Sequence, residues 1–152
     1  MRASDVMTSP VITIPELTPI PAAAALLASH GFTSAPVVDS RRRMIGIVTE
    51  SDLVRGQIRP EGASAGAEPV GATVSGVMTA DPLFARPEDD LAEVVWRMQD
   101  GSVRSVPIVR DEELVGIVTR RDVLRVIARG ELTSDDVRQR RSGVADGATP
   151  SG

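Results

Sequence analysis

The chain has 152 residues, a formal net charge of −4 at pH 7, and 41% hydrophobic but only 2% aromatic residues. All 17 basic residues are arginines, cysteine is absent, and His30 is the single histidine. This composition excludes a Schiff-base lysine, a phosphate-loop lysine, a thiol nucleophile and a thiolate metal site. The acidic balance argues against bulk nucleic-acid binding, which needs a basic field.

No apolar run approaches the ~18 residues that a membrane-spanning helix needs. No secretory signal pattern precedes the first predicted elements. We therefore expect a soluble cytoplasmic protein that does not act on a membrane. Because nucleophile, base and metal-ligand clusters are missing, we also expect that it is not an enzyme.

A seven-residue stretch occurs twice and organises the chain. Gly46–Asp52 reads GIVTESD, and Gly116–Asp122 reads GIVTRRD, 116 − 46 = 70 residues later. Similar pairs recur at offsets of 70 to 72, namely Val6-Met7-Thr8 with Val77-Met78-Thr79, Pro10 with Pro82, Pro15-Glu16 with Pro87-Glu88, and Pro36 with Pro107. Such periodicity indicates two copies of one unit. A unit of ~55 residues buries little surface alone, so we expect the halves to share a core.

The first copy predicts a lead-in helix followed by strand, helix, strand, strand and helix. Thr18-Pro19 is typical of an N-cap with proline at the first helical position, and Gly31 of a C-cap, so a helix is expected over Ala22–His30. Short β-rich runs bounded by turn residues predict the strands. The other elements are a lead-in helix at Ala3–Met7, strands at Val11–Ile14, Ala35–Val38 and Met44–Val48, and a helix at Ser51–Gln57.

The second copy predicts the same order. Its long helix carries Leu91, Val94, Val95 and Met98 at helical spacing and stops at Gly101. The others are a lead-in helix at Val74–Met78, strands at Val106–Val109 and Leu114–Val118, and a helix at Arg121–Arg129.

Composition sets the domain boundaries. Repeat 1 covers residues 1–58 and repeat 2 covers 73–130, joined by a linker over 59–72 that is rich in glycine, alanine and proline. Residues 131–152 form a tail, which we expect to be partly disordered, with a helical turn capped by Thr133 or Ser134.

The tandem β-α-β-β-α unit resembles the CBS domain pair, or Bateman module. Each copy begins with V-M-T, carries P-V or P-I before its hairpin, and ends in G-I-V-T-x-x-D, so the resemblance covers roughly 3–57 and 73–129. It implies an α/β (α+β) fold with two CBS repeats packed as a pseudo-twofold sandwich. It also implies clefts that bind AMP, ADP or ATP, in some members S-adenosylmethionine, a regulatory role, and a homodimer. We expect a free-standing pair.

The T-x-x-D motif allows two interpretations. Thr49 and Thr119 stand where a strand meets a helix start, which suits a phosphate, and the resemblance implies that Asp52 and Asp122 accept hydrogen bonds from ribose hydroxyls. The backbone near Ile47 could read the adenine edge, and the glycine three residues before each threonine could let a flat base approach. The same pattern also describes a helix capping box, a local device worth about 1 kcal/mol that needs no ligand.

The two clefts differ in charge. The resemblance implies a basic residue three positions before the proline of one copy, which reaches the phosphates of a nucleotide held by the aspartate of the other. Arg104 holds that position in the second copy and Thr33 in the first. A guanidinium matches phosphate geometry better than a hydroxyl does, although Arg104 could also be a solvated surface charge. The preferred site is therefore Thr49 and Asp52 with Arg104 from the opposite copy, and the Thr119/Asp122 cleft is weaker or empty.

Thr13, in the first strand, is a further candidate lining residue. We expect no required cofactor and no metal, and a ligand that binds at about micromolar affinity, or ~8 kcal/mol. The alternative function is a ligand-free dimeric module that docks another protein.

Overall fold

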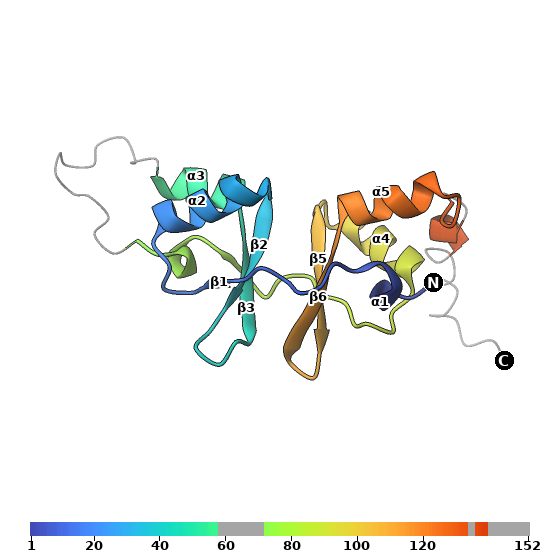
Figure 1. The fold of residues 1–152 in the computed structure, drawn as a ribbon, viewed down its shortest axis with the longest axis horizontal. Coiled ribbons are helices and arrows are strands. Elements are labelled where there is room, and N and C mark those ends of the chain that lie inside the picture. Colours follow the sequence, from blue (N-terminus) through green and yellow to red (C-terminus); the bar gives the residue numbers. More distant parts are fainter. Residues whose placement is uncertain (58–71, 134–135, 140–152) are drawn as a thin grey trace. The chain divides into compact units, whose positions relative to one another are not determined.

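A computed structural model describes residues 1–57, 72–133 and 136–139. The chain forms two compact units, shown in Figure 1. One unit contains Ile12–Pro82 and is called the Asp52 unit below. The other combines Met1–Val11 with the described residues from Leu83 onward and is called the Asp122 unit. The predicted linker falls almost entirely outside the described residues, as does most of the predicted tail.

The Asp52 unit is a four-stranded sheet with two helices and one 3₁₀ turn (Figure 1). The strand order is β1-β2-β3-β4, with β1 parallel to β2 and the other pairs antiparallel. In chain order the elements are β1 (Ile14–Pro15), α2 (Ile20–His30), β2 (Ser34–Val38), β3 (Met44–Thr49), α3 (Glu50–Gln57), η1 (Val74–Gly76) and β4 (Thr79–Ala80).

The Asp122 unit repeats this arrangement with shorter outer pairings. Its elements are α1 (Ala3–Val6), α4 (Leu91–Asp100), β5 (Ser105–Arg110), β6 (Glu113–Thr119) and α5 (Arg120–Ala128). Strands β5 and β6 are antiparallel. Single bridges join Ala85 to Ile108 in parallel and Thr8 to Ile117 in antiparallel orientation, at the places that β1 and β4 hold in the other unit. The repeat in sequence is thus a repeat in topology.

The compact units do not follow the sequence repeats, because the lead-in segments are exchanged. The segment at the start of repeat 1 packs in the Asp122 unit, where Thr8 and Ile117 exchange backbone hydrogen bonds of 2.8 and 3.0 Å. The segment at the start of repeat 2 packs in the Asp52 unit, where Thr79 pairs with Ile47. Each sheet is therefore completed by chain from the other repeat.

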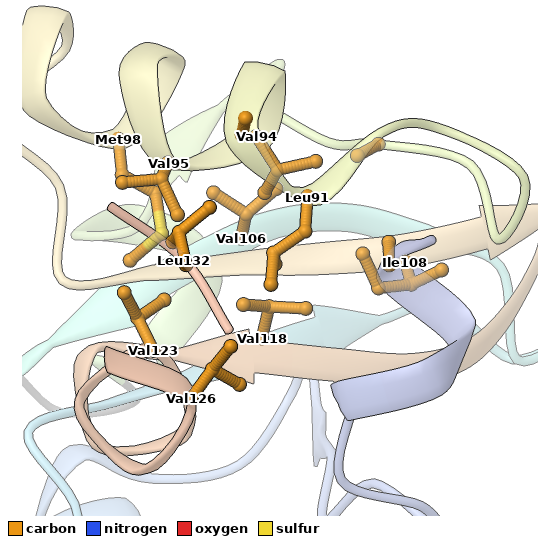
Figure 2. Packing of buried hydrophobic residues seen from close by; sticks show 13 residues of the cluster. Leu91, Val94, Val95, Met98, Val106, Ile108, Val118, Val123, Val126 and Leu132 are labelled. Atoms are coloured by element: carbon orange, nitrogen blue, oxygen red, sulfur yellow. The ribbon is translucent and has the colours of Figure 1, made fainter. Parts of the chain in front are cut away.

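Among the described residues, each unit buries a hydrophobic cluster of its own. In the Asp122 unit, side chains from α4, β5, β6 and α5 point into one cluster (Figure 2). Its largest fully buried members include Leu91, Ile108 and Val118. In the Asp52 unit, Ile14 and Ile20 are the corresponding large buried residues. The exchanged segments contribute to these clusters, since Ala3 belongs to one and Val74 to the other.

Most predicted elements are present, with shifts of one or two residues at their ends. Helix α2 begins at Ile20, two residues before the expected Ala22, and its N-cap is Pro19 rather than Thr18. Gly31 ends the helix in the left-handed conformation at φ 66°. The first strand shrinks to Ile14–Pro15, the two residues that pair with β2. The lead-in of repeat 2 is a 3₁₀ turn instead of a helix. None of the helices in the described ranges is long and hydrophobic enough to cross a bilayer.

Candidate functional site

Asp52 lies at the junction between β3 and α3. The backbone N–H of Thr49 donates to Asp52 Oδ2 at 2.9 Å, and the Asp52 N–H donates to Thr49 Oγ1 at 3.1 Å. These reciprocal bonds form a capping box. Arg55, one turn further along α3, donates to Asp52 Oδ1. The carboxylate side chain is 4% exposed whereas that of Arg55 is 71% exposed, so a flexible arginine covers a buried acid.

Asp122 holds the equivalent place between β6 and α5 and makes the same capping box. The Thr119 N–H donates to Oδ2 at 2.9 Å, and the Asp122 N–H donates to Thr119 Oγ1 at 3.2 Å. Three further donors reach this carboxylate. They are the Thr119 hydroxyl at 3.0 Å, the Arg125 guanidinium at 3.4 Å, and the Thr8 hydroxyl at 3.1 Å from Oδ1 and 3.3 Å from Oδ2.

The two carboxylates therefore differ in unused hydrogen-bonding capacity. An ionised carboxylate offers about four acceptor positions. Asp122 meets four donor groups, from Thr119 N–H, Thr119 hydroxyl, Arg125 and Thr8. Within the described part of the chain Asp52 meets two, from Thr49 and Arg55. The remaining capacity at Asp52 equals the number of donors in the two adjacent hydroxyls of a ribose.

A third T-x-x-D motif shows what the pattern does on its own. Thr133 donates to Asp136 Oδ2 through its N–H at 2.7 Å and its hydroxyl at 2.8 Å, and the Asp136 N–H returns a bond of 3.2 Å to the hydroxyl. The Thr133 N–H, and then its hydroxyl, lower the pKa of Asp136. Residues 136–139 are helical, and Thr133 makes the capping contacts that the sequence predicts. All three motifs are capping boxes, but only Asp52 and Asp122 are buried.

The space beside Gly46 and Gly116 is filled by residues of the same unit. A Cβ on Gly46 would lie 2.6 Å from Met78 Sδ and 2.7 Å from the Thr79 carbonyl oxygen, and one on Gly116 would meet the Met7 side chain. The hypothesis that these glycines let a flat base approach the strand is therefore wrong on this face. The glycines accommodate the exchanged lead-in segments instead.

The other predicted site residues are divided between the units. Thr13 and Ile47 belong to the Asp52 unit and are both partly exposed. Arg104 belongs to the Asp122 unit, is exposed, and accepts the Arg120 N–H at its carbonyl at 2.9 Å. Thr33 accepts the Glu50 N–H at the same distance in the Asp52 unit. Arg104 and Thr33 therefore hold equivalent places beside the start of a helix.

Thr8 was not among the predicted site residues, although it contacts Asp122. The signal was present in the sequence, since V-M-T stands near the start of both repeats. The contact itself could not be predicted, because Thr8 is 114 residues from Asp122 and reaches it only through the exchange of the lead-in segments.

The family model for the CBS domain matches residues 3–59 and 74–129. The chain belongs to the CBS domain family. Among curated proteins, uncharacterized protein MJ1404 of Methanocaldococcus jannaschii is 30% identical over 134 residues, which cover 84% of this chain and 32% of that protein. Hypoxic response protein 1 of Mycobacterium tuberculosis is 28% identical over 123 residues, covering 81% and 82%. The CBS pair thus spans about a third of one relative and most of the other.

Solved CBS structures share this fold. The CBS domain pair of protein MJ0100, in complex with 5′-methylthioadenosine and S-adenosyl-L-methionine, matches with a TM-score of 0.73 and 25% identity over 86% of this chain and 98% of that one. CBSX2 in complex with AMP matches with a TM-score of 0.73 and 25% identity over 84% and 97%. The ligands in both structures contain adenosine.

Proposed function

We propose that this CBS domain pair is a non-enzymatic regulatory module that binds an adenosine-containing ligand at the Asp52 site. AMP, ADP and ATP are favoured over S-adenosylmethionine, because Arg104 suits a phosphate. The observation that carries the proposal is the buried carboxylate of Asp52, which stands at a helix start and keeps acceptor capacity for two more donors.

Each part of such a ligand has a complementary group. The ribose hydroxyls donate to Asp52, while Arg55 moves aside into solvent. The phosphate is attracted by the start of α3 and by the Arg104 guanidinium of the other repeat. Thr49 contributes a hydroxyl at the phosphate end, and Thr13 and the backbone of Ile47 line the base. Few charged contacts are involved, so the expected affinity is modest, at about micromolar.

Thermal unfolding of the full chain with AMP, ADP, ATP and S-adenosylmethionine tests the proposal. A ligand at 100 times its Kd stabilises the folded state by about 2.7 kcal/mol, and we expect a rise in Tm with at least one nucleotide. Asp52→Asn should abolish the ligand-induced rise, while Asp122→Asn, the matched control, should keep most of it. The ligand-induced difference within each variant is compared, because either substitution also weakens a helix cap by about 1 kcal/mol.

The absence of a rise with any of these ligands would contradict the proposal. So would an equal loss in both variants, because the two carboxylates would then be interchangeable.

A second candidate function is a ligand-free, dimeric protein-interaction module. Large apolar side chains are exposed at equivalent places on α3 and α5, with Val54 at 58% and Leu124 at 57% exposed, where 54 + 70 = 124. Ile127 on α5 is 49% exposed. Exposed apolar groups gathered on a helix face are typical of contact surfaces. Sedimentation of Val54→Glu and Leu124→Glu variants tests this function, because a dimer held through α3 should dissociate in the first variant and a dimer held through α5 in the second.

A further inference from the structure

We propose that the Thr8 hydroxyl prevents the Asp122 carboxylate from binding a ribose, so that the exchanged N-terminal segment decides which of the two buried T-x-x-D sites takes ligand. This inference rests on the proposed adenosine-binding function. It assigns a specificity-determining role to a residue outside both T-x-x-D motifs.

The Thr8 hydroxyl spans both oxygens of the Asp122 carboxylate, at 3.1 and 3.3 Å. A ribose hydroxyl would need the same lone pairs. Thr8 is held there through its backbone, which exchanges two hydrogen bonds with Ile117. The preceding residue, Met7, fills the space beside Gly116. A ligand can therefore not push the Thr8 backbone away without breaking the edge of the sheet.

The other unit provides the contrast. Thr79 is the counterpart of Thr8 and pairs with Ile47 as Thr8 does with Ile117. Between the described residues Thr79 and Asp52, however, the structure has no hydrogen bond. Asp52 instead contacts Arg55 of its own helix, and the Arg55 side chain is 71% exposed. A long exposed side chain moves aside at little cost, so Asp52 is covered but accessible.

The expected size of the effect follows from the bond that a ligand must replace. A hydrogen bond to a charged group contributes roughly tenfold or more to an equilibrium. Removing the Thr8 hydroxyl should therefore raise the affinity of the Asp122 site about tenfold. The Asp52 site should not respond, since Thr8 does not belong to it.

Isothermal titration calorimetry with AMP tests this on the full chain in the Asp52→Asn background, where only the Asp122 site remains. Thr8→Val replaces the hydroxyl with a methyl group of similar size, and about tenfold tighter AMP binding is expected. Thr8→Ser keeps the hydroxyl and should bind as weakly as the background. Thr79→Val, made in the otherwise unchanged chain, is the matched control and should leave AMP binding at the Asp52 site unaltered. A melting curve of each variant verifies that it is folded.

The outcomes separate this inference from the function on which it rests. If the unchanged chain binds none of AMP, ADP, ATP and S-adenosylmethionine, the proposed function fails, and this inference with it. If it binds another of these ligands but not AMP, that ligand replaces AMP in the titrations. If the unchanged chain binds AMP but Thr8→Val gives no gain, the proposed function stands and the role of Thr8 is overturned. Weaker binding in Thr8→Val also overturns it, because Thr8 would then hold the ligand rather than exclude it.

Discussion

The two units share a sheet order and a capping box but differ in what surrounds each of them. At Asp122 four donor groups occupy the carboxylate, while at Asp52 there are two. The lead-in segment bonds to the aspartate in one unit and only to the strand in the other. Duplication thus preserved the scaffold, and single side chains made the two sites unequal. Sites in a repeat protein should therefore be compared by the hydrogen-bond donors around each carboxylate, and not only by the motif that they share.

The largest difference expected between the units concerns their glycines. Gly46→Ala should lower the free energy of unfolding by about 2–3 kcal/mol, because overpacking a tight contact forces backbone movement. The new Cβ would lie 2.7 Å from the Thr79 carbonyl oxygen, which belongs to β4. For Gly116→Ala, the three atoms nearest the new Cβ all belong to the Met7 side chain. A methionine side chain adapts readily, so this change should cost less. Urea unfolding of the two variants measures the difference, and a larger loss for Gly116→Ala would contradict it.

The next difference concerns the threonine caps. Loss of a cap typically costs about 1 kcal/mol, which we expect for Thr49→Val. Thr119→Val should cost more, about 2 kcal/mol, because its hydroxyl also donates to the buried Asp122 carboxylate at 3.0 Å. Urea unfolding again gives the values, with Thr133→Val as a control of low cost at an exposed cap. Equal losses for Thr49→Val and Thr119→Val would show that the extra hydrogen bond contributes nothing.

The helices and strands could be predicted from the sequence because local patterns determine them. The repeated GIVT strand, the Gly31 C-cap and the apolar spacing of Leu91, Val94, Val95 and Met98 each predict an element that the structure contains. The residues at which the helices and strands begin and end could be predicted less closely. Strand length depends on pairing partners, and β1 has only Val37 and Val38 to pair with.

The residues of the site could be predicted only in part, because they depend on which distant segments pack together. Asp52, Asp122 and their threonines were identified from the motif, and the equivalence of Arg104 and Thr33 follows from the repeat. The contact of Thr8 with Asp122 joins residues 114 positions apart, and no local pattern predicts it. The room beside Gly46 was misinterpreted for the same reason, since Met78 and Thr79 come from the following repeat.

A smaller difference lies in the two hairpins. Strands β5 and β6 are joined through Asp111 and Glu112, whose φ angles of 49° and 68° match a type I′ turn. Glycine is favoured at the second of these positions. Glu112→Gly should therefore stabilise the fold by about 0.5 kcal/mol. The substitution relieves the strain of the left-handed conformation, and the greater flexibility of glycine in the unfolded chain offsets part of that gain.

In the other hairpin, Ser40→Gly is the matched control, because Ser40 does not have a positive φ. It should give no gain in the free energy of unfolding. Glu112→Gln separates charge from conformation, since it removes the carboxylate and keeps the strain. A gain in Glu112→Gln equal to that in Glu112→Gly would attribute the effect to charge instead.

The smallest effect is the pH dependence that Asp39 gives to the β2–β3 hairpin. Asp39 Oδ1 accepts the N–H groups of Arg43 at 3.0 Å and Arg41 at 2.8 Å, whereas Arg110 stands at the equivalent position, 39 + 71 = 110. The Arg43 N–H lowers the pKa of Asp39, helped by the Arg41 N–H and the Arg43 guanidinium and opposed by partial desolvation. The folded state therefore favours the ionised carboxylate. Its contribution is complete above the unfolded pKa of about 3.9 and is lost as pH falls through the lower folded value. Urea midpoints between pH 3 and 6 should fall less steeply on acidification for Asp39→Asn than for the unchanged chain, and identical curves would show that these bonds are absent in solution.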